Sequence, residues 1–252
     1  MSLARRARTS VSEPHVLVLL RRLLQRPGAV HGENIVGSCE QAALRAARGL
    51  AGNNGSVTVC TVGRARREEK ALQLALGRYA DRAIRVSDSG ADRLDYLGIA
   101  RALHAVVKRF DAPLHAVVCG DRSEDGLSGA VGPALAELLD LPHLSGIVDL
   151  EFGDSVVATT RSGGFLHRFR IDMPAVLCVR ECTHEVADST SESPPTAVET
   201  LTFRDLELGT EILVPRTRLD GSMSAVRTGV NATIAANPAE LVALLTADHL
   251  LP

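Results

Sequence analysis

The first 142 residues alternate between short apolar runs and segments with helical periodicity, and this alternation limits the possible folds most strongly. Four runs are short, apolar and rich in β-branched residues, as buried strands are: 16–20, 56–62, 83–86 and 114–119. Between them, apolar residues recur at the spacing of one helix face, for example Leu72, Leu76 and Tyr79. Strands that alternate with helices form parallel sheets with right-handed crossovers. The pattern therefore predicts a parallel sheet with helices on both faces.

The first helix is expected to begin at Ser38. Ser38 and Gln41 have the spacing of a capping box, in which each side chain bonds the backbone amide of the other residue. Ala43, Ala47 and Leu50 follow at helical spacing and form its apolar face.

After Pro142 the helical segments give way to consecutive strand-like segments, and Gly163-Gly164 between two of them predicts a hairpin turn. The later stretch EVADSTSESPPTAVET is rich in Ser, Thr and Pro, which is typical of a linker or arm. A short helix over about residues 238–245 is expected after Asn237, whose side chain would cap it.

Residues 120–142, GDRSEDGLSGAVGPALAELLDLP, place four glycines between a predicted strand and a predicted helix. Pro133 is tolerated only in the first turn of a helix, so this helix should begin near Gly132. The backbone amides of Ala134 and Leu135 would then lack intrahelical partners, and the helix dipole adds positive potential there. These features predict an anion site at the carboxyl end of a parallel strand, where open α/β sheets bind ligands.

The glycines support the same interpretation. Gly126, Gly129 and Gly132 have no side chain, so a phosphate could reach the backbone of the loop. The alternative is a glycine-rich turn that binds nothing. On the residues alone, phosphate or nucleotide binding is the better supported of the two.

Composition indicates which residue types form the core and argues against nucleic acid as a partner. The 252 residues are 45% hydrophobic but only 3% aromatic, with no Trp, so Val, Leu and Ala must form the core. The net charge is −2, and the basic cluster Arg64, Arg66 and Arg67 is followed directly by Glu68 and Glu69. Nucleic-acid binding requires clustered positive charge, so we do not predict it.

The cysteines and apolar runs bear on the compartment. Three of the five cysteines end or interrupt strand-like runs, which argues for a reducing compartment. No apolar run approaches the roughly 18 residues of a membrane span. Residues 1–14 carry three arginines and no acid before Glu13, a weak likeness to a transit peptide. We expect a cytoplasmic protein with a disordered tail at 1–14, or a mitochondrial matrix protein if that tail is a transit peptide.

Other signatures are not satisfied. Neither lysine follows a glycine, as a Walker loop requires. The run around Ser128 misses the nucleophile elbow by one position, so Ser128 is interpreted as a turn or capping residue. Cys178, Cys182 and His184 could bind a metal but lack a fourth ligand. We therefore predict no catalytic residue and no metal site.

In their order along the chain, the segments resemble the β subunit of electron transfer flavoproteins from His15 to about Leu245. The matching stretches are HVLVLLRR, CEQAALRAARGL, LGRYADRAIRV, EDGLSGAVGPALAELLDLP and SGGFLHRFRIDMPAVLCV. Each match is loosely specific, and their common order carries the resemblance. It implies an α/β fold: a three-layer parallel-sheet nucleotide-binding domain (Rossmann-like) over residues 15–182 that includes a C-terminal β-hairpin region. An extended arm over residues 183–252 would contact a partner subunit.

The resemblance also implies a function. Such a subunit pairs with an α subunit that holds the redox-active FAD. The heterodimer carries electrons from flavin dehydrogenases to a quinone reductase-type acceptor, so the chain would be an electron carrier subunit and not an enzyme. The loop corresponding to residues 120–132 wraps the phosphates of AMP or, in electron-bifurcating members, of a second FAD.

The expected cofactor-binding residues follow from the same resemblance. Asp125, Gly126 and Gly132 match the loop motif of the family directly. The other positions come from the rest of the loop, from the start of the first helix and from the ends of two strands. The full expected set is Leu19, Val36, Gly37, Val62, Gly120, Asp125, Gly126, Leu127, Ser128, Gly129, Ala130, Val131 and Gly132.

Several motif positions differ from the family. Leu127 stands where the motif has a second acid, and Gly129 and Ala130 stand at its Gln or Thr-Gln positions. Each lost side-chain hydrogen bond would weaken nucleotide binding by roughly 0.5–1.5 kcal/mol. Two alternatives therefore stay open: a stand-alone adenine-nucleotide-binding or sensor domain, and a scaffold subunit that has lost the nucleotide.

Overall fold

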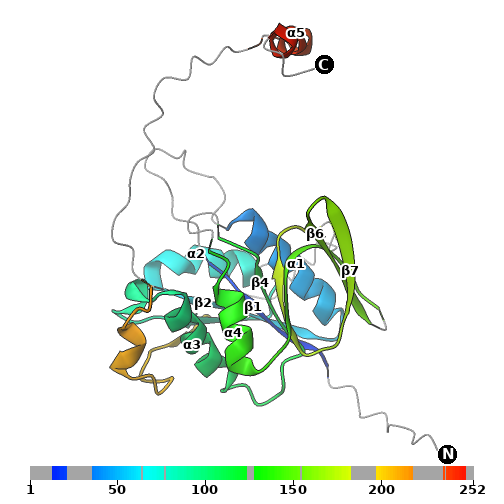
Figure 1. Ribbon diagram of the computed structural model, residues 1–252. Coiled ribbons are helices and arrows are strands. Elements are labelled where there is room, and N and C mark those ends of the chain that lie inside the picture. The colour runs from blue at the N-terminus through cyan, green and yellow to red at the C-terminus, as the bar shows by residue number, and fades with distance from the viewer. Residues whose placement is uncertain are drawn as a thin grey trace, which may run out of the picture. The chain divides into compact units, whose positions relative to one another are not determined.

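The computed structural model describes residues 13–21, 36–63, 65–76, 78–123, 128–153, 155–182, 197–217, 235 and 237–247. Within them, nine strands form one sheet: β1 (His15–Leu19), β2 (Ser56–Val62), β3 (Arg82–Val86), β4 (Ala116–Gly120), β5 (His143–Glu151), β6 (Val156–Ser162), β7 (Phe165–Ile171), β8 (Ala175–Val179) and β9 (Glu199–Leu201). Their spatial order is β7-β6-β5-β8-β4-β1-β2-β3-β9 (Figure 1). Only the β5–β6 and β6–β7 pairs are antiparallel.

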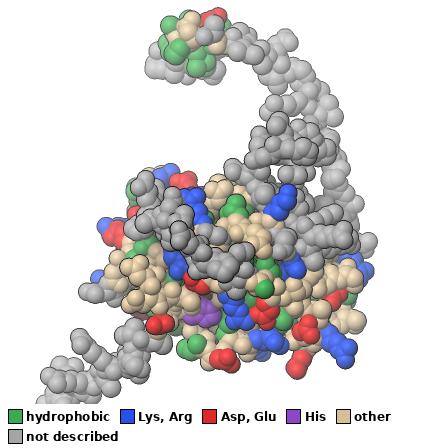
Figure 2. All heavy atoms as spheres, turned by 180° about the vertical axis from the view of Figure 1, so that it is seen from behind, with side chains coloured by type: hydrophobic (Ala, Val, Ile, Leu, Met, Phe, Trp, Pro, Cys, Tyr) green, Lys and Arg blue, Asp and Glu red, His purple; other side chains and the backbone are tan. Residues whose placement is uncertain are grey.

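Helices cover the two faces of the sheet, which confirms the predicted three-layer α/β architecture. The helices of this domain are α1 (Ser38–Ala51), α2 (Ala65–Leu76), α3 (Tyr96–Val107) and α4 (Val131–Leu139). The buried side chains of α1 and α2 belong to the core on one face, and those of α3 and α4 belong to the core on the other. No helix among the described residues is long and apolar enough to cross a membrane. Acidic and basic side chains are interspersed over the described surface that Figure 2 shows.

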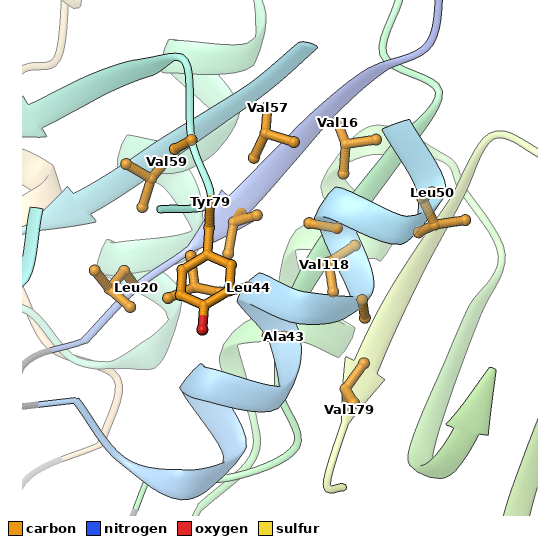
Figure 3. Close-up of a cluster of buried hydrophobic side chains, with 14 of the residues drawn as sticks. Val16, Leu20, Ala43, Leu44, Leu50, Val57, Val59, Tyr79, Val118 and Val179 are labelled. Atoms are coloured by element: carbon orange, nitrogen blue, oxygen red, sulfur yellow. The ribbon is translucent and has the colours of Figure 1, made fainter. Parts of the chain in front are cut away.

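Small side chains bring α1 close to the sheet. Figure 3 shows Ala43, Leu44 and Leu50 of α1 gathered with valines from β1, β2 and β4. Four alanines of α1 are buried: Ala42, Ala43, Ala46 and Ala47. Their small side chains let the backbone of α1 pack against the sheet, so this core needs few large aromatic residues. Each fully buried Val or Leu in such a core stabilises the fold by roughly 1.5–3 kcal/mol relative to an exposed one.

The predicted capping box at Ser38 is wrong. Gly37 is the N-cap, with an extended backbone and no side-chain cap hydrogen bond, so Ser38 is already the first helical residue. Gln41 therefore sits one position too far along the helix for the box. Its side-chain amide instead donates to the carbonyl of Val36 at 3.0 Å.

The stretch 197–217, which the sequence assigned to the arm, packs onto the α/β domain. Residues 199–201 form β9, which pairs in parallel with β3 at one edge of the sheet. Phe203 and Ile212 are buried in the α3 face, and Asp95, the N-cap of α3, accepts hydrogen bonds from the amides of Arg216 and Thr217 at 2.6 and 3.0 Å. The first compact unit accordingly ends at Thr217, because this stretch carries enough apolar side chains to join the core.

The structure describes only part of the predicted tail and of the rest of the predicted arm. Residues 1–12 and 183–196 lie outside the described residues. In the second unit, 218–252, α5 (Pro238–Ala247) begins after Asn237. The side chain of Asn237 accepts from the amide of Glu240 at 2.9 Å, which confirms the predicted cap.

The predicted hairpin is confirmed between β6 and β7. Gly163 and Gly164 have φ of +57° and +80°, which favours glycine at both positions of a tight turn. β7 is an edge strand, and six of its seven residues are exposed.

A buried carboxylate joins the carboxyl ends of β4 and β8 to the middle of β5. Asp121, directly after β4, is 8% exposed and accepts from the amide of Gly146 in β5 at 2.7 Å. Its other oxygen accepts from Nε and Nη2 of Arg180, directly after β8, at 3.1 and 2.9 Å. Gly146 has φ of +72° where the β5–β8 register shifts. Asp121 thus holds an irregular strand in place.

We expect Asp121→Ala to lower the free energy of unfolding by roughly 2–3 kcal/mol, because it removes several hydrogen bonds and leaves Arg180 without its anion. Urea unfolding monitored by circular dichroism measures this change. Glu151→Ala is the control, since its ion pair with Arg168 is exposed on both sides and should contribute less than about 1 kcal/mol. Equal losses in the two variants would contradict the assigned role of Asp121.

Candidate functional site

A cavity of about 340 Å³ lies at the carboxyl ends of β1, β2 and β4, beside the loop that leads into α4. From β1 the chain proceeds through β2 and β3 on one side, and it returns to β4 on the other. This reversal is the topological switch point at which open α/β sheets form a ligand crevice. Apolar walls come from residues such as Leu94, Ile99 and Leu103.

The structure brings together most of the predicted cofactor-binding residues that it describes. Those that line the cavity are Leu19, Val62, Gly120, Ser128, Gly129, Ala130, Val131 and Gly132. Val36 and Gly37 are not among its lining residues, and Val36 is buried in the core on the α1 face. Asp125, Gly126 and Leu127 lie outside the described residues.

The glycines of the loop also meet packing requirements within the chain. Gly129 has φ of +59°, and a Cβ there would lie 2.7 Å from the carbonyl oxygen of Asp121. A Cβ on Gly120 would lie 3.1 Å from the Cβ of Cys39. A Cβ on Gly132 would lie 2.5 Å from the sulfur of Cys178 and 2.8 Å from that of Cys119. The side of Gly132 on which a side chain would project therefore faces the sheet, and the sequence did not predict this.

The amino-terminal end of α4 differs from the prediction by one residue. Because α4 begins at Val131, the amide of Ala134 donates to the carbonyl of Ala130 at 3.1 Å, and the prediction that it lacks a partner is wrong. By helix geometry, the amides without an intrahelical partner are those of Ala130, Val131 and Gly132, since Pro133 has no N–H. Ala130, Val131 and Gly132 all line the cavity, so the amino-terminal end of α4, where the helix dipole is positive, borders it.

Four charged residues that the sequence reasoning missed also line the cavity: Arg21, Glu40, Asp92 and Arg122. Glu40 in α1 is 4% exposed. The guanidinium of Arg122 is half-exposed and lies 3.3 Å from Asp121. Arginine can attract a phosphate, and carboxylates can accept hydrogen bonds from ribose or base donors. Arg21 and Arg122 each lie two residues after a strand of the sheet, which was the available signal for them, whereas Glu40 within α1 and Asp92 offered none.

Thiols form the floor of the cavity. All five cysteines lie in the described residues as thiols, and Cys60 and Cys119 line the cavity. Burial raises the pKa of Cys60 to about 12, so it stays protonated. The sulfurs of Cys119 and Cys178 are 3.5 Å apart. No cluster of three metal-binding side chains occurs among the described residues, and His184 lies outside them.

The chain matches a known family over most of its length. A profile of the electron transfer flavoprotein domain matches residues 29–205. The electron transfer flavoprotein subunit beta of Methylophilus methylotrophus is 35% identical over 128 residues, and Protein FixA of Azotobacter vinelandii is 33% identical over 138. The subunit beta of Bacillus subtilis is 26% identical over 206 residues.

These alignments differ in extent. The first covers 49% of this chain and 47% of the Methylophilus protein, and the second covers 52% of this chain and 49% of the Azotobacter protein. The chain thus spans about half the length of these two relatives. The Bacillus alignment covers 78% of this chain and 79% of the relative.

We expect Gly132→Ala to destabilise the fold by roughly 1–3 kcal/mol, because its methyl group would overlap the sulfurs of Cys119 and Cys178. Gly153→Ala is the matched control, since a Cβ there has no neighbour within 4 Å. Denaturant unfolding of both variants provides the measurement. An unchanged midpoint for Gly132→Ala would mean that α4 does not rest on the thiols.

Proposed function

The chain belongs to the electron transfer flavoprotein family, and on that premise we propose that it is a β-type subunit with a nucleotide in the cavity beside residues 120–132. The observation that carries this proposal is the position of the cavity. It lies at the switch point of the sheet, and the first turn of α4 and two arginines line it. The subunit would carry electrons together with an α subunit and would have no catalytic residue of its own.

The nucleotide that fits best is AMP. A volume of about 340 Å³ is near the lower end of the roughly 300–1,000 Å³ typical of small-molecule sites, which favours a mononucleotide over a whole second FAD. The amides of Val131 and Gly132 would receive the phosphate, and Arg21 and Arg122 would neutralise its charge. The apolar wall from Leu94 to Leu103 would exclude water from the base.

Electrons would be carried by FAD held mainly by the α subunit, since a flavin supplies the redox chemistry and the protein supplies binding and orientation. Flavin dehydrogenases as donors and a quinone reductase-type acceptor are part of this proposal. Four of the five cysteines are buried as thiols, which is consistent with a reducing compartment such as the cytoplasm.

The surface of β7 supports docking of an α subunit. Phe165 and Phe169 are 71% and 43% exposed and alternate onto the face of the hairpin that continues the buried Leu150 and Ala158. The same edge strand carries Arg168 and Arg170. An exposed, unpaired edge strand with aromatic side chains is a liability unless a partner covers it.

One observation favours the scaffold alternative. Gly129 and Gly132 each have a packing reason within the chain, so the loop does not need a ligand to explain them. In that case the chain would keep its partner and lack the nucleotide.

The nucleotide test uses the purified heterodimer with its co-expressed α subunit. We expect denaturation to release about one AMP for each heterodimer, identified by mass spectrometry, in addition to the flavin of the α subunit. Release of flavin alone would support the scaffold alternative. A chain that binds AMP by calorimetry but forms no heterodimer would support the stand-alone domain.

Arg122→Ala should weaken AMP binding about 10- to 150-fold, because a charge-assisted hydrogen bond contributes roughly 1.5–3 kcal/mol. Calorimetric titration with AMP measures the change. Arg204→Ala removes an exposed arginine that does not line the cavity and should leave the affinity unchanged. Equal effects of the two substitutions would argue for a nonspecific charge effect.

Phe165→Glu combined with Phe169→Glu should weaken the heterodimer at least about tenfold, because two aromatic anchors are replaced by charges. Leu166→Glu is the matched control, since Leu166 is 63% exposed but points to the opposite face of β7. Size-exclusion chromatography at several concentrations compares the variants. Loss of the heterodimer in the control alone would place the partner on the other face.

A further inference from the structure

Two cysteines lie side by side below the cavity. Cys119 of β4 and Cys178 of β8 are directly paired residues of adjacent parallel strands. Their sulfurs are 3.5 Å apart, and both residues belong to the buried core on the α4 face. We propose that Cys119 and Cys178 form a redox-active dithiol, which a hydroperoxide that enters the cavity oxidises to a disulfide.

The backbone positions permit this bond. Neighbouring strands lie about 4.7–4.9 Å apart, and disulfides join Cα atoms that are about 4.4–6.8 Å apart. Both side chains project from the same face of the sheet. The sulfurs must approach each other by roughly 1.5 Å to reach the bond length of about 2.05 Å.

Gly132 leaves room for the reaction. Any other residue there would place a Cβ within 2.8 Å of both sulfurs, so the two thiols could not keep their present positions below the first turn of α4. With glycine, Cys119 lines the cavity, whereas Cys178 lies beneath it. A small oxidant in the cavity therefore reaches Cys119 first.

The hydrogen bonds prepare the pair for oxidation. The thiol of Cys119 donates to the sulfur of Cys178, which raises the pKa of Cys119, and burial raises it further. The same hydrogen bond, with one from Ser145, lowers the pKa of Cys178 despite burial. Cys178 is thus the thiol of the pair that gives up its proton more readily, and Cys119 keeps the proton that it donates to Cys178.

The reaction balances with a hydroperoxide as the only co-reactant. Once the pair has lost one proton, Cys119 passes its own proton to Cys178 along the S–H···S hydrogen bond, and the Cys119 thiolate attacks the outer oxygen of the hydroperoxide. The O–O bond breaks, and the leaving alkoxide takes a proton from water. The product is a sulfenic acid at Cys119. Cys178 then attacks that sulfur, the S–S bond forms, and water leaves with the proton of Cys178. Two thiols and one hydroperoxide yield one disulfide, one alcohol and one water.

The role of the cavity as the access route rests on the proposed function. A nucleotide in the cavity would cover Cys119 and shield the dithiol. AMP at about ten times its Kd would leave about one site in ten open and slow disulfide formation about tenfold. Nucleotide binding in the cavity and the redox state of Cys119 and Cys178 would then be coupled.

The test treats the full chain with hydrogen peroxide, blocks the remaining thiols with N-ethylmaleimide, and maps the peptides by mass spectrometry. We expect one cross-linked peptide pair that contains Cys119 and Cys178, and a thiol reductant should reverse it. A cross-link to Cys39 or Cys60 instead, or sulfinic acid at Cys119 without a cross-link, would overturn the proposal.

Variants and nucleotide separate the remaining possibilities. Cys119→Ala and Cys178→Ala should each abolish the cross-link, whereas Cys182→Ser, on the α1 face of the core, should retain it. The wild-type peptide map keeps the test decisive if an alanine variant does not fold. If AMP binds by calorimetry but does not slow the reaction, access through the cavity is refuted. If AMP does not bind, the proposed function fails, and the peptide map still decides on the dithiol.

Discussion

The carboxylate of Asp121 organises the edge of the sheet that borders the cavity. It bonds the irregular backbone of β5 at Gly146 and the guanidinium of Arg180 after β8. The carbonyl of the same residue lies against Gly129, so the left-handed turn before α4 is packed onto it. Residue 121 thus supports this edge of the sheet twice, through its backbone carbonyl at the turn before α4 and through a carboxylate that is almost fully buried. Such a group is tolerated only because its oxygens are engaged by several donors.

The cavity combines main-chain donors with charged side chains. Backbone amides at the start of α4 offer hydrogen bonds, while Arg21 and Arg122 offer charge. Gly129 and Ala130 cannot contribute side-chain hydrogen bonds. In the proposed complex, affinity would come from charge and main-chain donors, and the base would be recognised mainly by shape. The proposed dithiol below the cavity would also make this site sensitive to hydroperoxides.

Local patterns in the sequence were sufficient for much of the fold. The alternation of strand and helix, the Gly163-Gly164 hairpin and the Asn237 cap were all predicted, because each depends on contacts within a few residues. The capping box at Ser38 also depends on local spacing. It was predicted wrongly because the N-cap is one residue earlier, at Gly37, so Gln41 bonds the carbonyl of Val36 instead. The stretch 197–217 was assigned to the arm because the preceding sequence is rich in Ser, Thr and Pro. The apolar residues Phe203 and Ile212 within it were not recognised as core residues.

The sequence alone established that this chain forms a parallel α/β sheet with a glycine-rich loop at a strand end, because hydrophobic periodicity and backbone sterics act locally. It could not show that Gly132 rests on two sulfurs, nor that Cys119 meets Cys178, 59 residues later in the chain. Those contacts require the order β8-β4-β1, and strand order results from packing over the whole core. The glycines were found from the sequence, but the direction of their open sides came from the folded sheet.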